Sequence, residues 1–595
     1  MKRYYIGLAA TLHDPAVAIV DPAGRPVFAE ATERYLQNKR AYNCPPDDMI
    51  RMPSLIDEHC GQDAELVAAL NWSDAFLAQL DALCGLPSEA RPPGPHDDVL
   101  GWPLPDPRAL TQALRHGLRQ AGLNLTSSRH VRQPVAVRRF DHHLTHAASA
   151  YASPFAECCV AVVDGFGEGT ATACYHYRDG RLTALGSDSD ASPFQPTASL
   201  GHFYSRLCAL CGFDPLRGEE WKVMGLAPYG ERDPELYDLL RPTIEVRGLT
   251  LAPGLPDAEI ADRLRRLRQA MRPPGSSPLE AADLARTGQE IFEEILLELL
   301  SNLWRRQPCD ALVLAGGCAL NSSANGKVVE RTPFRELHVP SAPADDGTAL
   351  GAALLAFYAD HPEAVPLGGP ATPYLGSSLD PGALDRLLRF GGLGGVERLG
   401  EEAPARAAEL LARGRIVGWV QGAAEYGPRA LGNRSILADP RPADMKDRIN
   451  DGVKFREEFR PFAPAILDAH GAEYFRGYQT SPYMDRTLVF RPEVRNRVPA
   501  VVHVNGTGRL QSVRREWNPR FHDLIAAFHA ATGVPLVLNT SFNVMGKPIM
   551  HSVEDALGVF FTTGLDALFV EDYLLQKESS ASASPAEGSL RSRST

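Results

Sequence analysis

Two histidines spaced one helical turn apart are the residues of this sequence best suited to bind a metal. His142 and His146 occur in the run Phe-Asp-His-His-Leu-Thr-His, and residues four apart lie on one face of a helix. Residues 144–152 are rich in alanine, which favours that helix. Imidazole nitrogens bind iron, zinc, nickel and copper. A bare pair of this kind is more often exposed than metal-bound, so other segments must decide.

Carboxylates from two other segments could complete such a site. The apolar residues 158–163 predict a buried strand, which ends at Asp164-Gly165 in a glycine-rich turn. Asp345 opens a predicted helix, where an acidic residue is also a common cap. We predict a metal site of two histidines and one carboxylate, beside a hairpin whose backbone binds phosphate.

Short strands separated by polar turns begin the chain. Strands are predicted at residues 4–9, 16–20 and 26–31, with His13 and Asp14 in the first turn. The Asp164 turn repeats this arrangement, since apolar strands lie on both sides of it. Two such hairpins favour two ribonuclease-H-like halves around a cleft, although a pair of ordinary hairpins would give the same pattern.

Two glycines separate a buried strand from a helix further along the chain. Gly316 and Gly317 follow the apolar residues 311–315, which lets a nucleotide approach the backbone at the helix N-terminus. The segment is not a P-loop, because Gly326-Lys327 is followed by valine.

Composition divides the chain into two domains and a tail. Residues 362–373 are rich in proline and glycine and predict a linker. This places a first domain at 1–361 and a second at 374–577. Residues 578–595 are rich in serine and alanine without an apolar pattern, so we expect a disordered tail.

Three segments of the first domain differ in regularity. Residues 279–304 carry an apolar stripe with helical spacing and predict one long amphipathic helix. Residues 40–130 are expected to form an insertion that contains short helices at 64–70 and 73–83. Residues 253–278 are rich in arginine and are expected to be irregular.

The second domain contains cations in glycine-rich surroundings. Arg429 follows Gly-Pro, Arg509 follows Gly-Thr-Gly, and Lys454 begins a run of cations interleaved with aromatics. Asn539 and Ser541 lie in a polar turn after an apolar strand. Arginine binds phosphate and carboxylate in a bidentate manner, and surface salt bridging explains Gly-Pro-Arg poorly. We predict small-anion sites.

Composition limits the possible functions. The 595 residues carry a net charge of −12, with 44% hydrophobic and 23% charged residues, which is typical of a globular protein with roughly two to four domains. The acidity excludes a large nucleic-acid surface, and no long apolar run predicts a membrane span. The ten cysteines are sparse, and Cys208 and Cys211 are expected to pack within a helix. We expect a cytoplasmic protein.

Several long motifs together resemble the O-carbamoyltransferase family of nodulation and antibiotic-tailoring enzymes. The motifs follow the order of that family from residue 1 to about 577 and include Asp-His-His-Leu-x-His-Ala-Ala-Ser-Ala, Val-Asp-Gly-Phe-Gly-Glu, Lys-Val-Met-Gly-Leu-Ala, Ala-Gly-Gly-Cys-Ala-Leu-Asn, Gly-Pro-Arg-Ala-Leu-Gly-Asn-Arg-Ser and Leu-Asn-Thr-Ser-Phe-Asn. The resemblance implies an α/β protein. Its first domain would be actin-like, similar to tRNA threonylcarbamoyl-transfer proteins, and its second would be similar to YrdC-type threonylcarbamoyl-adenylate synthases.

The resemblance also assigns roles to residues. The implied metal ligands are His142, His146 and Asp345. The implied contacts of ATP and carbamoyl phosphate in the second domain are Arg429, Lys454, Arg509, Asn539 and Ser541. The implied transfer-site residues are His13, Asp14 and Lys222 as catalytic groups, with Asp164, Gly165, Gly316, Gly317 and Asn321 around the bound cofactor.

The implied reaction has two stages. Carbamoyl phosphate and ATP, with Mg²⁺, would give carbamoyl adenylate in the second domain. The first domain, with Fe²⁺ or another divalent transition metal, would pass the carbamoyl group to a hydroxyl of a small secondary metabolite, as in antibiotic biosynthesis. His13 or Asp14 would accept the hydroxyl proton. Neither nucleic acid nor membrane is an expected partner, and a monomer or homodimer is expected.

Three positions depart from the pattern of this family. Asn505 replaces an expected aspartate, Trp221 replaces a small residue and narrows the wall beside Lys222, and Pro15 replaces a serine. These departures leave the full set of ligands open.

Two other classes of function also remain open at this stage. An actin-like ATPase or sugar kinase would explain the hairpins but not the arginine-rich second domain. A nucleotide-binding scaffold of tRNA modification would conflict with the net acidity. A hydrogenase-maturation carbamoyltransferase would be expected to carry paired CxxC motifs, which the sequence lacks.

Overall fold

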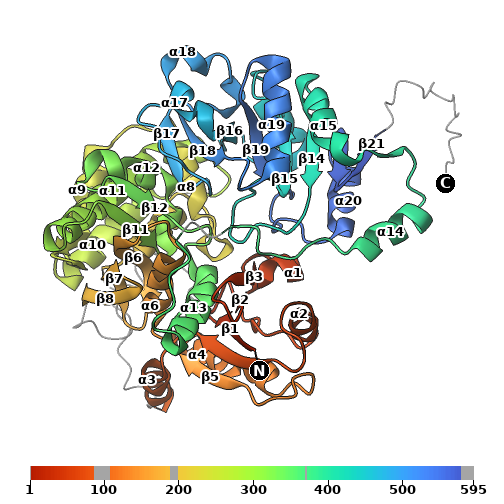
Figure 1. The fold of residues 1–595 in the computed structure, drawn as a ribbon. Coiled ribbons are helices and arrows are strands. Elements are labelled where there is room, and N and C mark those ends of the chain that lie inside the picture. The colour runs from red at the N-terminus through yellow and green to blue at the C-terminus, as the bar shows by residue number, and fades with distance from the viewer. Residues whose placement is uncertain (1, 86–106, 188–197, 369–371, 578–595) are drawn as a thin grey trace, which may run out of the picture.

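The computed structural model describes residues 2–85, 107–187, 198–368 and 372–577. The structure is a mixed α/β protein, in agreement with the predicted fold class (Figure 1). The expected disordered tail and part of the predicted linker, residues 369–371, lie outside the described residues. None of the helices in the described ranges is long and apolar enough to cross a membrane.

The first sheet is formed by the N-terminal strands. Its order is β3-β2-β1-β4-β5, where β1 to β3 are antiparallel and β4 and β5 continue parallel to β1. The predicted strands of the first hairpins are confirmed within a residue or two. The bounds are β1 Arg3–Ala9, β2 Ala16–Val20, β3 Pro26–Ala31, β4 Glu65–Leu70 and β5 Ala136–Arg139.

The second sheet repeats this topology. Its order is β12-β11-β6-β7-β8, with β6 to β8 antiparallel and β11 and β12 parallel to β6. Each sheet therefore has three antiparallel strands followed by two parallel ones, which confirms two ribonuclease-H-like halves. The bounds are β6 Glu157–Gly167, β7 Thr170–Arg178, β8 Arg181–Ser187, β11 Ala311–Ala315 and β12 Glu336–His338.

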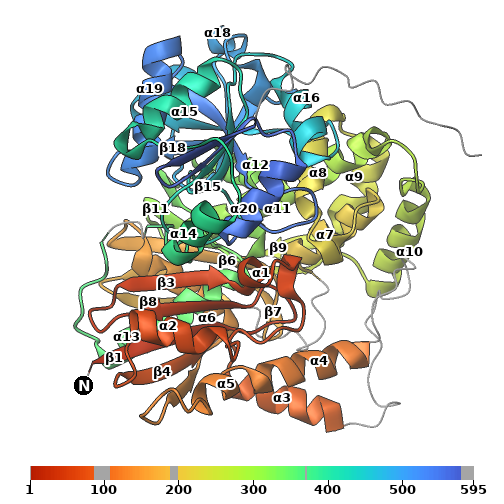
Figure 2. The same cartoon turned by 90° about the vertical axis from the view of Figure 1, so that its right-hand side faces the viewer.

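One buried helix, α13 (Thr348–Asp360), joins the two halves (Figure 2). It packs so closely on β1 that a Cβ at Gly7 would lie 1.8 Å from the carbonyl oxygen of Ala349. On α6 (His142–Ala147) it packs equally closely, since a Cβ at Gly351 would lie 1.8 Å from the carbonyl oxygen of Thr145. The helix that follows Asp345 is thus held against the helix that carries both histidines.

Two expectations for the first domain are wrong. Residues 64–70 do not form a helix but contribute β4, which lies between β1 and β5 in the first sheet, so residues 40–130 are not simply an insertion. Strand β4, with the sequence Glu-Leu-Val-Ala-Ala-Leu, is buried on both faces. Such a strand has no alternating pattern that would distinguish it from a helix. Residues 253–278 contain a regular helix, α10 (Asp257–Leu267), whose apolar face includes Ile260 and Leu264.

Other elements of the first domain agree with expectation. The long amphipathic helix is α11, and Cys208 in α7 and Cys211 at the end of that helix are buried in the core. The remaining bounds are α1 Thr32–Leu36, α2 Arg51–His59, α3 Asp74–Gly85, α4 Pro107–Gln120, α5 Leu123–Thr126, α7 Leu200–Leu210, α8 Glu220–Leu226, α9 Pro234–Leu240, β9 Ile244–Arg247, β10 Thr250–Pro253, α11 Ala282–Arg306 and α12 Ser322–Arg331.

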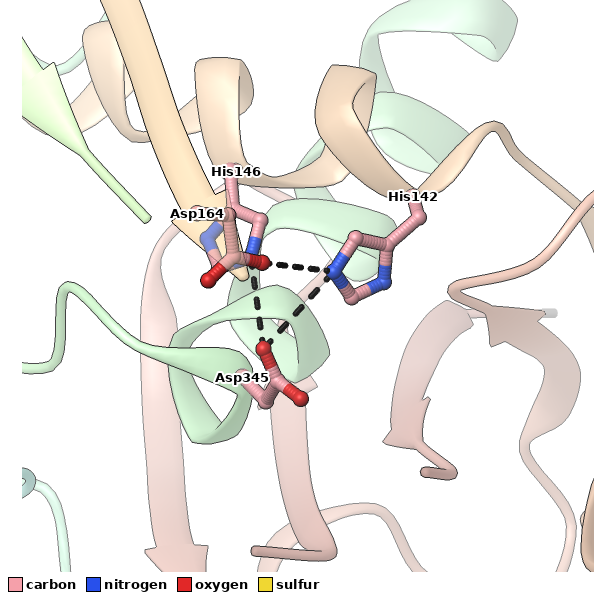
Figure 3. Close-up of side chains that lie close together, drawn as sticks. All are labelled: His142, His146, Asp164 and Asp345. Atoms are coloured by element: carbon pink, nitrogen blue, oxygen red, sulfur yellow. Dashed lines mark hydrogen bonds and ion pairs between the residues drawn. The ribbon is translucent and has the colours of Figure 1, made fainter. Parts of the chain in front are cut away.

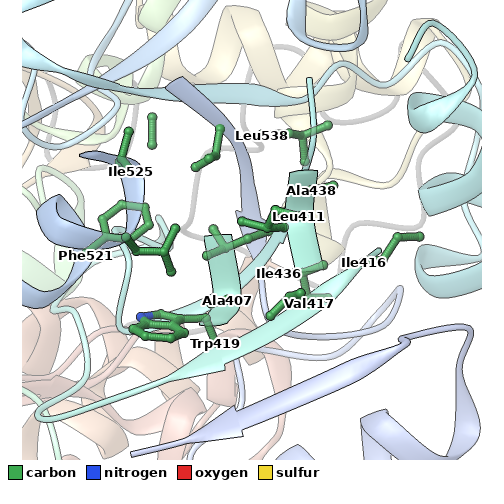
Figure 4. Packing of buried hydrophobic residues seen from close by; sticks show 14 of the residues in the cluster. Ala407, Leu411, Ile416, Val417, Trp419, Ile436, Ala438, Phe521, Ile525 and Leu538 are labelled. Atoms are coloured by element: carbon green, nitrogen blue, oxygen red, sulfur yellow. The ribbon is translucent and has the colours of Figure 1, made fainter. Parts of the chain in front are cut away.

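The second domain is built on a nine-stranded sheet of order β13-β21-β20-β14-β15-β19-β16-β18-β17. Its core surrounds Trp419 of β14, where α15 and α19 cover the sheet with residues such as Leu411 and Phe521 (Figure 4). The boundary at 362–373 and the similarity to YrdC stay predictions. The bounds are α14 Pro381–Phe390, β13 Val396–Arg398, α15 Ala403–Ala412, β14 Val417–Val420, β15 Arg434–Ala438, α16 Met445–Ile449, β16 Ala463–Leu467, α17 Gly471–Tyr474, β17 Arg486–Val489, α18 Pro492–Arg495, β18 Thr507–Val513, α19 Pro519–Thr532, β19 Leu536–Ser541, α20 Val553–Thr562, β20 Ala567–Val570 and β21 Tyr573–Gln576.

Candidate metal centre and interdomain anion site

Four side chains from three distant segments converge between the two sheets (Figure 3). The ligand atoms of His142, His146, Asp164 and Asp345 all lie within 4.8 Å of one another. Nε2 of His142 is 3.3 Å and Nε2 of His146 is 3.5 Å from Oδ2 of Asp164. The same nitrogens are 3.7 Å and 3.6 Å from Oδ1 of Asp345. The predicted histidine pair and carboxylate are brought together, with one more carboxylate.

Hydrogen bonds fix the start of α6 and therefore the direction of its histidines. The carboxylate of Asp141 caps the helix by accepting the Leu144 N–H at 2.8 Å. Glu168, in the β6–β7 turn, accepts the His142 N–H at 3.1 Å and bonds Ser73 at the start of α3. The Trp72 ring stacks on the His142 imidazole with centroids 4.3 Å apart. The hairpin predicted to bind phosphate thus also supports the metal-type cluster.

Asp164 lies with the candidate metal ligands, whereas the sequence placed it around the cofactor. Its Oδ1 accepts the Gly317 N–H at 2.9 Å, and its Oδ2 faces both histidines. Gly316 allows this approach, because it has a φ of 91° and a Cβ there would lie 2.3 Å from the carbonyl oxygen of Val163. The Gly316-Gly317 turn therefore orients a carboxylate, in the way that outer partners orient metal ligands.

The chemistry of these four residues suits a bound divalent transition metal. Both histidines are buried, and His146 Nε2 has no hydrogen-bond partner among the described residues. Burial lowers the pKa of His146, but Asp164 and Asp345 outweigh burial and raise that pKa to about 9. One buried and one partly exposed carboxylate against two imidazoles favour a positive charge between them. Two histidines with a carboxylate are the ligand set of non-haem iron sites.

His13 and Asp14 lie beside the cluster. His13 Nδ1 is 2.9 Å from Asp14 Oδ2 and 3.9 Å from Asp345 Oδ2. Arg40 donates to the same Asp14 oxygen at 2.9 Å. Burial raises the pKa of Asp14, but the charges of Arg40 and His13 outweigh burial and hold that pKa well below its usual value. Asp14 is therefore suited to orient His13 and is a weak base.

Three other predicted site residues, Lys222, Asn321 and Gly165, do not belong to this cluster. Lys222 and Asn321 already bond other protein side chains. Lys222 forms ion pairs of 2.8 Å with both Glu219 and Glu457. The Asn321 amide pairs with Gln289 at 3.0 Å through both its oxygen and its nitrogen, and its oxygen also caps α12. Gly165 lies at the end of the buried part of β6, near the ring of His202.

A cavity of about 910 Å³ lies between the two domains. The first domain contributes residues of the α1 region and α8, such as Gln37 and Lys222, together with Ser322. All five residues predicted to contact carbamoyl phosphate and ATP line the cavity, namely Arg429, Lys454, Arg509, Asn539 and Ser541. Three lining residues that the sequence analysis did not select, Arg456, Arg460 and His503, could have been found from the same cation-rich motifs.

Three cations of this cavity lack anionic partners in the described structure, whereas Lys222 and Arg460 pair with Glu457. Among the described residues, none forms an ion pair with Arg429, Lys454 or Arg509, and Arg509 Nε is buried without a hydrogen-bond partner. Burial lowers the pKa of Arg429 to about 10. Burial and then the charge of Arg429 hold the pKa of Arg509 well below its usual value. A bound polyanion would relieve this repulsion and supply the missing acceptors.

Neutral groups next to these cations are similarly prepared for a ligand. Lys454 Nζ donates to the Asn543 side chain at 2.8 Å and to the backbone of Ser541. The buried Asn539 Oδ1 has no partner within the described chain, while its Nδ2 donates to Gln511 at 2.9 Å. An unpaired polar atom beside cations at a cavity wall is typical of a polar ligand site.

A metal-type cluster in one domain and an anion-type cavity shared with a second are the parts of a transferase that handles an activated group. Family models agree, since residues 111–354 match the "Carbamoyltransferase N-terminus" and residues 408–577 match the "Carbamoyltransferase C-terminus". The chain belongs to the carbamoyltransferase family and is an enzyme of that class.

Two nodulation proteins are among the similar proteins. The chain is 38% identical to "Nodulation protein NolNO" of Sinorhizobium fredii, over 77% of this chain and 66% of that protein. It is 37% identical to "Nodulation protein NolO" of Bradyrhizobium diazoefficiens, over 73% of this chain and 79% of that protein. The chain thus spans slightly less than two thirds of the first. A solved structure of full-length HypF in the phosphate- and nucleotide-bound form aligns with 61% of the chain and 56% of HypF at 12% identity, with a TM-score of only 0.34.

Proposed function

We propose that the protein is an ATP-dependent O-carbamoyltransferase that uses carbamoyl phosphate and acts on a hydroxyl of a small natural product. The observation that carries the proposal is the interdomain cavity, which both domains line and in which Arg429, Lys454 and Arg509 have no carboxylate partner among the described residues. Small phosphorylated substrates fit this arrangement, because arginine and lysine absorb phosphate charge without a protein anion to displace.

The adenylate-forming step has a fixed balance of phosphorus. Carbamoyl phosphate and ATP together carry four phosphorus atoms, whereas carbamoyl adenylate retains one and pyrophosphate two. Inorganic phosphate must therefore be a third product, and one water is consumed to release it. The carbamate oxygen then bonds to the α-phosphorus of ATP as the bond to the β-phosphate breaks. Arg429, Lys454 and Arg509 would hold the phosphates, and Mg²⁺ would accompany ATP.

The transfer step would take place at the cluster in the first domain. The acceptor oxygen bonds to the carbamoyl carbon, the bond to the adenylate oxygen breaks, and AMP leaves. His13 would take the hydroxyl proton, with Asp14 holding its Nδ1 side at 2.9 Å. His142, His146, Asp345 and Asp164 would hold a divalent metal, Fe²⁺ in our proposal, whose positive charge when bound polarises an oxygen.

A product analysis tests this function. The protein is incubated with ATP, Mg²⁺, carbamoyl phosphate and a panel of hydroxylated metabolites of the kind modified in antibiotic biosynthesis. We expect AMP, pyrophosphate and phosphate in equal amounts and one carbamoylated acceptor by mass spectrometry. ADP as the nucleotide product would instead indicate a kinase or ATPase. A cytoplasmic location and a monomer or homodimer remain part of the proposal.

A further inference from the structure

The second-domain segment that follows Lys454 is anchored in the first domain. Phe459 is 6% exposed and belongs to the hydrophobic core of the second ribonuclease-H-like half, together with Val223 and Leu226 of α8. A Cβ at Gly225 would lie 3.5 Å from Cδ of Pro461, so this proline also packs on α8. The position of residues 455–461 therefore depends on a helix of the other domain.

Charged residues hold the same segment. Lys222 Nζ lies 2.8 Å from Oε1 of Glu219 in its own domain and 2.8 Å from Oε1 of Glu457 across the interface. The other oxygen of Glu457 accepts a hydrogen bond of 3.2 Å from Arg460 Nη1. Lys222 thus acts on Arg460 through Glu457, which fits a positioning role better than the catalytic role predicted for it.

An aromatic ring holds Arg460 from a second side. The Cζ atom of Arg460 lies 3.8 Å from the ring centroid of Trp221, which is the residue before Lys222. Arginine stacks on aromatic faces and keeps its N–H groups free in the plane of the guanidinium. Glu457 accepts a hydrogen bond at one edge of the Arg460 guanidinium, and the Trp221 ring covers one of its faces.

Arg460 is a cavity residue with one donor left unpaired. Arg460 lines the cavity with Arg456 and Arg509, and its Nε is buried without a hydrogen-bond partner in the described structure. Burial lowers the pKa of Arg460 to about 10, although Glu457 opposes the change. A buried guanidinium with a free N–H, held on two sides, is prepared to receive an anion.

We infer that Trp221 is a positioning residue that presents Arg460 to a phosphate group of the substrates, so that the first domain completes the anion site of the second. This inference rests on the proposed function. It also assigns a role to Trp221, which the sequence identified only as a bulky residue that narrows the wall beside Lys222. The ligand class is a phosphoryl group of carbamoyl phosphate or ATP, because a planar cation with a fixed orientation favours oxyanions.

The test is a double-mutant cycle between Trp221 and Arg460 in the full-length protein, followed by pyrophosphate release. Trp221→Leu keeps an apolar side chain but removes the aromatic face, and Arg460→Met removes the cation. We expect each to raise KM for carbamoyl phosphate or ATP by about tenfold, as the loss of one charge-assisted contact does, with a smaller change in kcat. Trp221→Phe should restore KM to within about threefold, since it keeps a stacking face.

The inference stands or falls on whether the effects of the Trp221 and Arg460 substitutions on KM are coupled. If Trp221 acts through Arg460, Trp221→Leu should add nothing in an Arg460→Met background. Additive effects, or a normal KM for Trp221→Leu, would overturn the inference. Tyr237→Ala is the matched control, because Tyr237 stacks on Arg232 at the same 3.8 Å but outside the cavity, and its KM should stay at the wild-type value.

A binding measurement separates this inference from the proposed function. If the wild-type protein released no pyrophosphate, the proposed reaction would fail. Calorimetric titration with inorganic pyrophosphate would still report on Arg460. Trp221→Leu and Arg460→Met should then each raise the Kd for pyrophosphate by about tenfold. The double variant should show no further increase. Unchanged affinity in Trp221→Leu would reject the positioning role whatever the reaction is.

Discussion

His146 Nε2 lies 3.6 Å from Oδ1 of Asp345, although the two residues belong to segments far apart in the chain. The contact exists because α13, which follows Asp345, packs on α6 through Gly351 without space for a side chain. The metal-type cluster is therefore a property of the join between the two ribonuclease-H-like halves. Neither half contains it alone.

Removal of one histidine should remove the metal. We expect His142→Ala or His146→Ala to lose at least about tenfold in metal affinity, because each supplies a buried ligand nitrogen. Elemental analysis of the purified proteins measures this. His176→Ala is the control, since His176 pairs with Glu157 at the surface. Wild-type metal content in both ligand variants would show that the cluster is not a metal site.

Asp164→Asn tests the fourth member of the cluster. The amide keeps the acceptor for the Gly317 N–H but removes the negative charge that faces both histidines. We expect weaker metal binding than in the wild type, with the thermal stability of the metal-free proteins less affected. Equal metal affinity would restrict the ligands to the two histidines and Asp345.

His13→Asn should separate transfer from adenylate formation. His13 is held by Asp14 beside the cluster but does not line the cavity. General-base catalysis contributes about 10²–10⁴-fold, so carbamoyl transfer should fall by about that factor while pyrophosphate release and metal content persist. Rates of both steps in one reaction mixture provide the check. Near wild-type transfer would place the base elsewhere.

Cations of the cavity should control the first step. Arg429→Ala, Lys454→Ala or Arg509→Ala removes a charge-assisted phosphate contact worth about 1.5–3 kcal/mol, so pyrophosphate release should fall by about tenfold or more. Carbamoyl adenylate, added directly, should restore transfer. Arg132→Ala is a useful comparison, because Arg132 is 63% exposed, already paired with Asp63 and not among the residues that line the cavity. Lack of rescue in a folded variant would mean that the two steps share one site.

A buried ion pair of the first domain, which also contacts the second domain, should make stability depend on pH. Glu30 of β3 pairs with Arg51 and accepts the N–H of Ser377 at 2.8 Å. Burial raises the pKa of Glu30, but Arg51 and then His551 outweigh burial and hold it well below 4.5. Because the folded pKa is lowered, the stabilisation is complete above 4.5 and is lost as the pH falls into the acidic range.

Glu30→Gln should therefore destabilise the protein most at neutral pH, by about 3–5 kcal/mol, since it leaves Arg51 buried without its partner. The difference from wild type should shrink as the pH falls below 4.5, as measured by calorimetric unfolding. Glu65→Gln, at a half-exposed pair with Arg3, should cost at most about 1 kcal/mol. A pH-independent effect of Glu30→Gln would contradict this account.

The sequence contained enough information to predict some elements of the fold and not others. The antiparallel hairpins and α11 could be predicted because their polar turns and apolar spacing are local signals. Residues 64–70 could not, since a strand that lies between parallel neighbours and is buried on both faces shows no period of two.

The candidate sites show the same division. His142 and His146 were found from their spacing, and the cations of the second domain from their glycine-rich motifs. Asp164 was assigned to the cofactor, because only the folded chain shows that the Gly317 N–H turns its carboxylate toward the histidines. The pairing of Lys222 with Glu457 is a tertiary contact between domains, which no local pattern encodes.

The most direct test of two connected sites is one assay on His146→Ala with ATP, carbamoyl phosphate and a competent acceptor. Pyrophosphate and the carbamoylated product are quantified together, with His176→Ala as the control. The account predicts that pyrophosphate release stays within about threefold of wild type while product falls by about 10²-fold or more. Loss of both products together, or full retention of carbamoyl transfer, would contradict it.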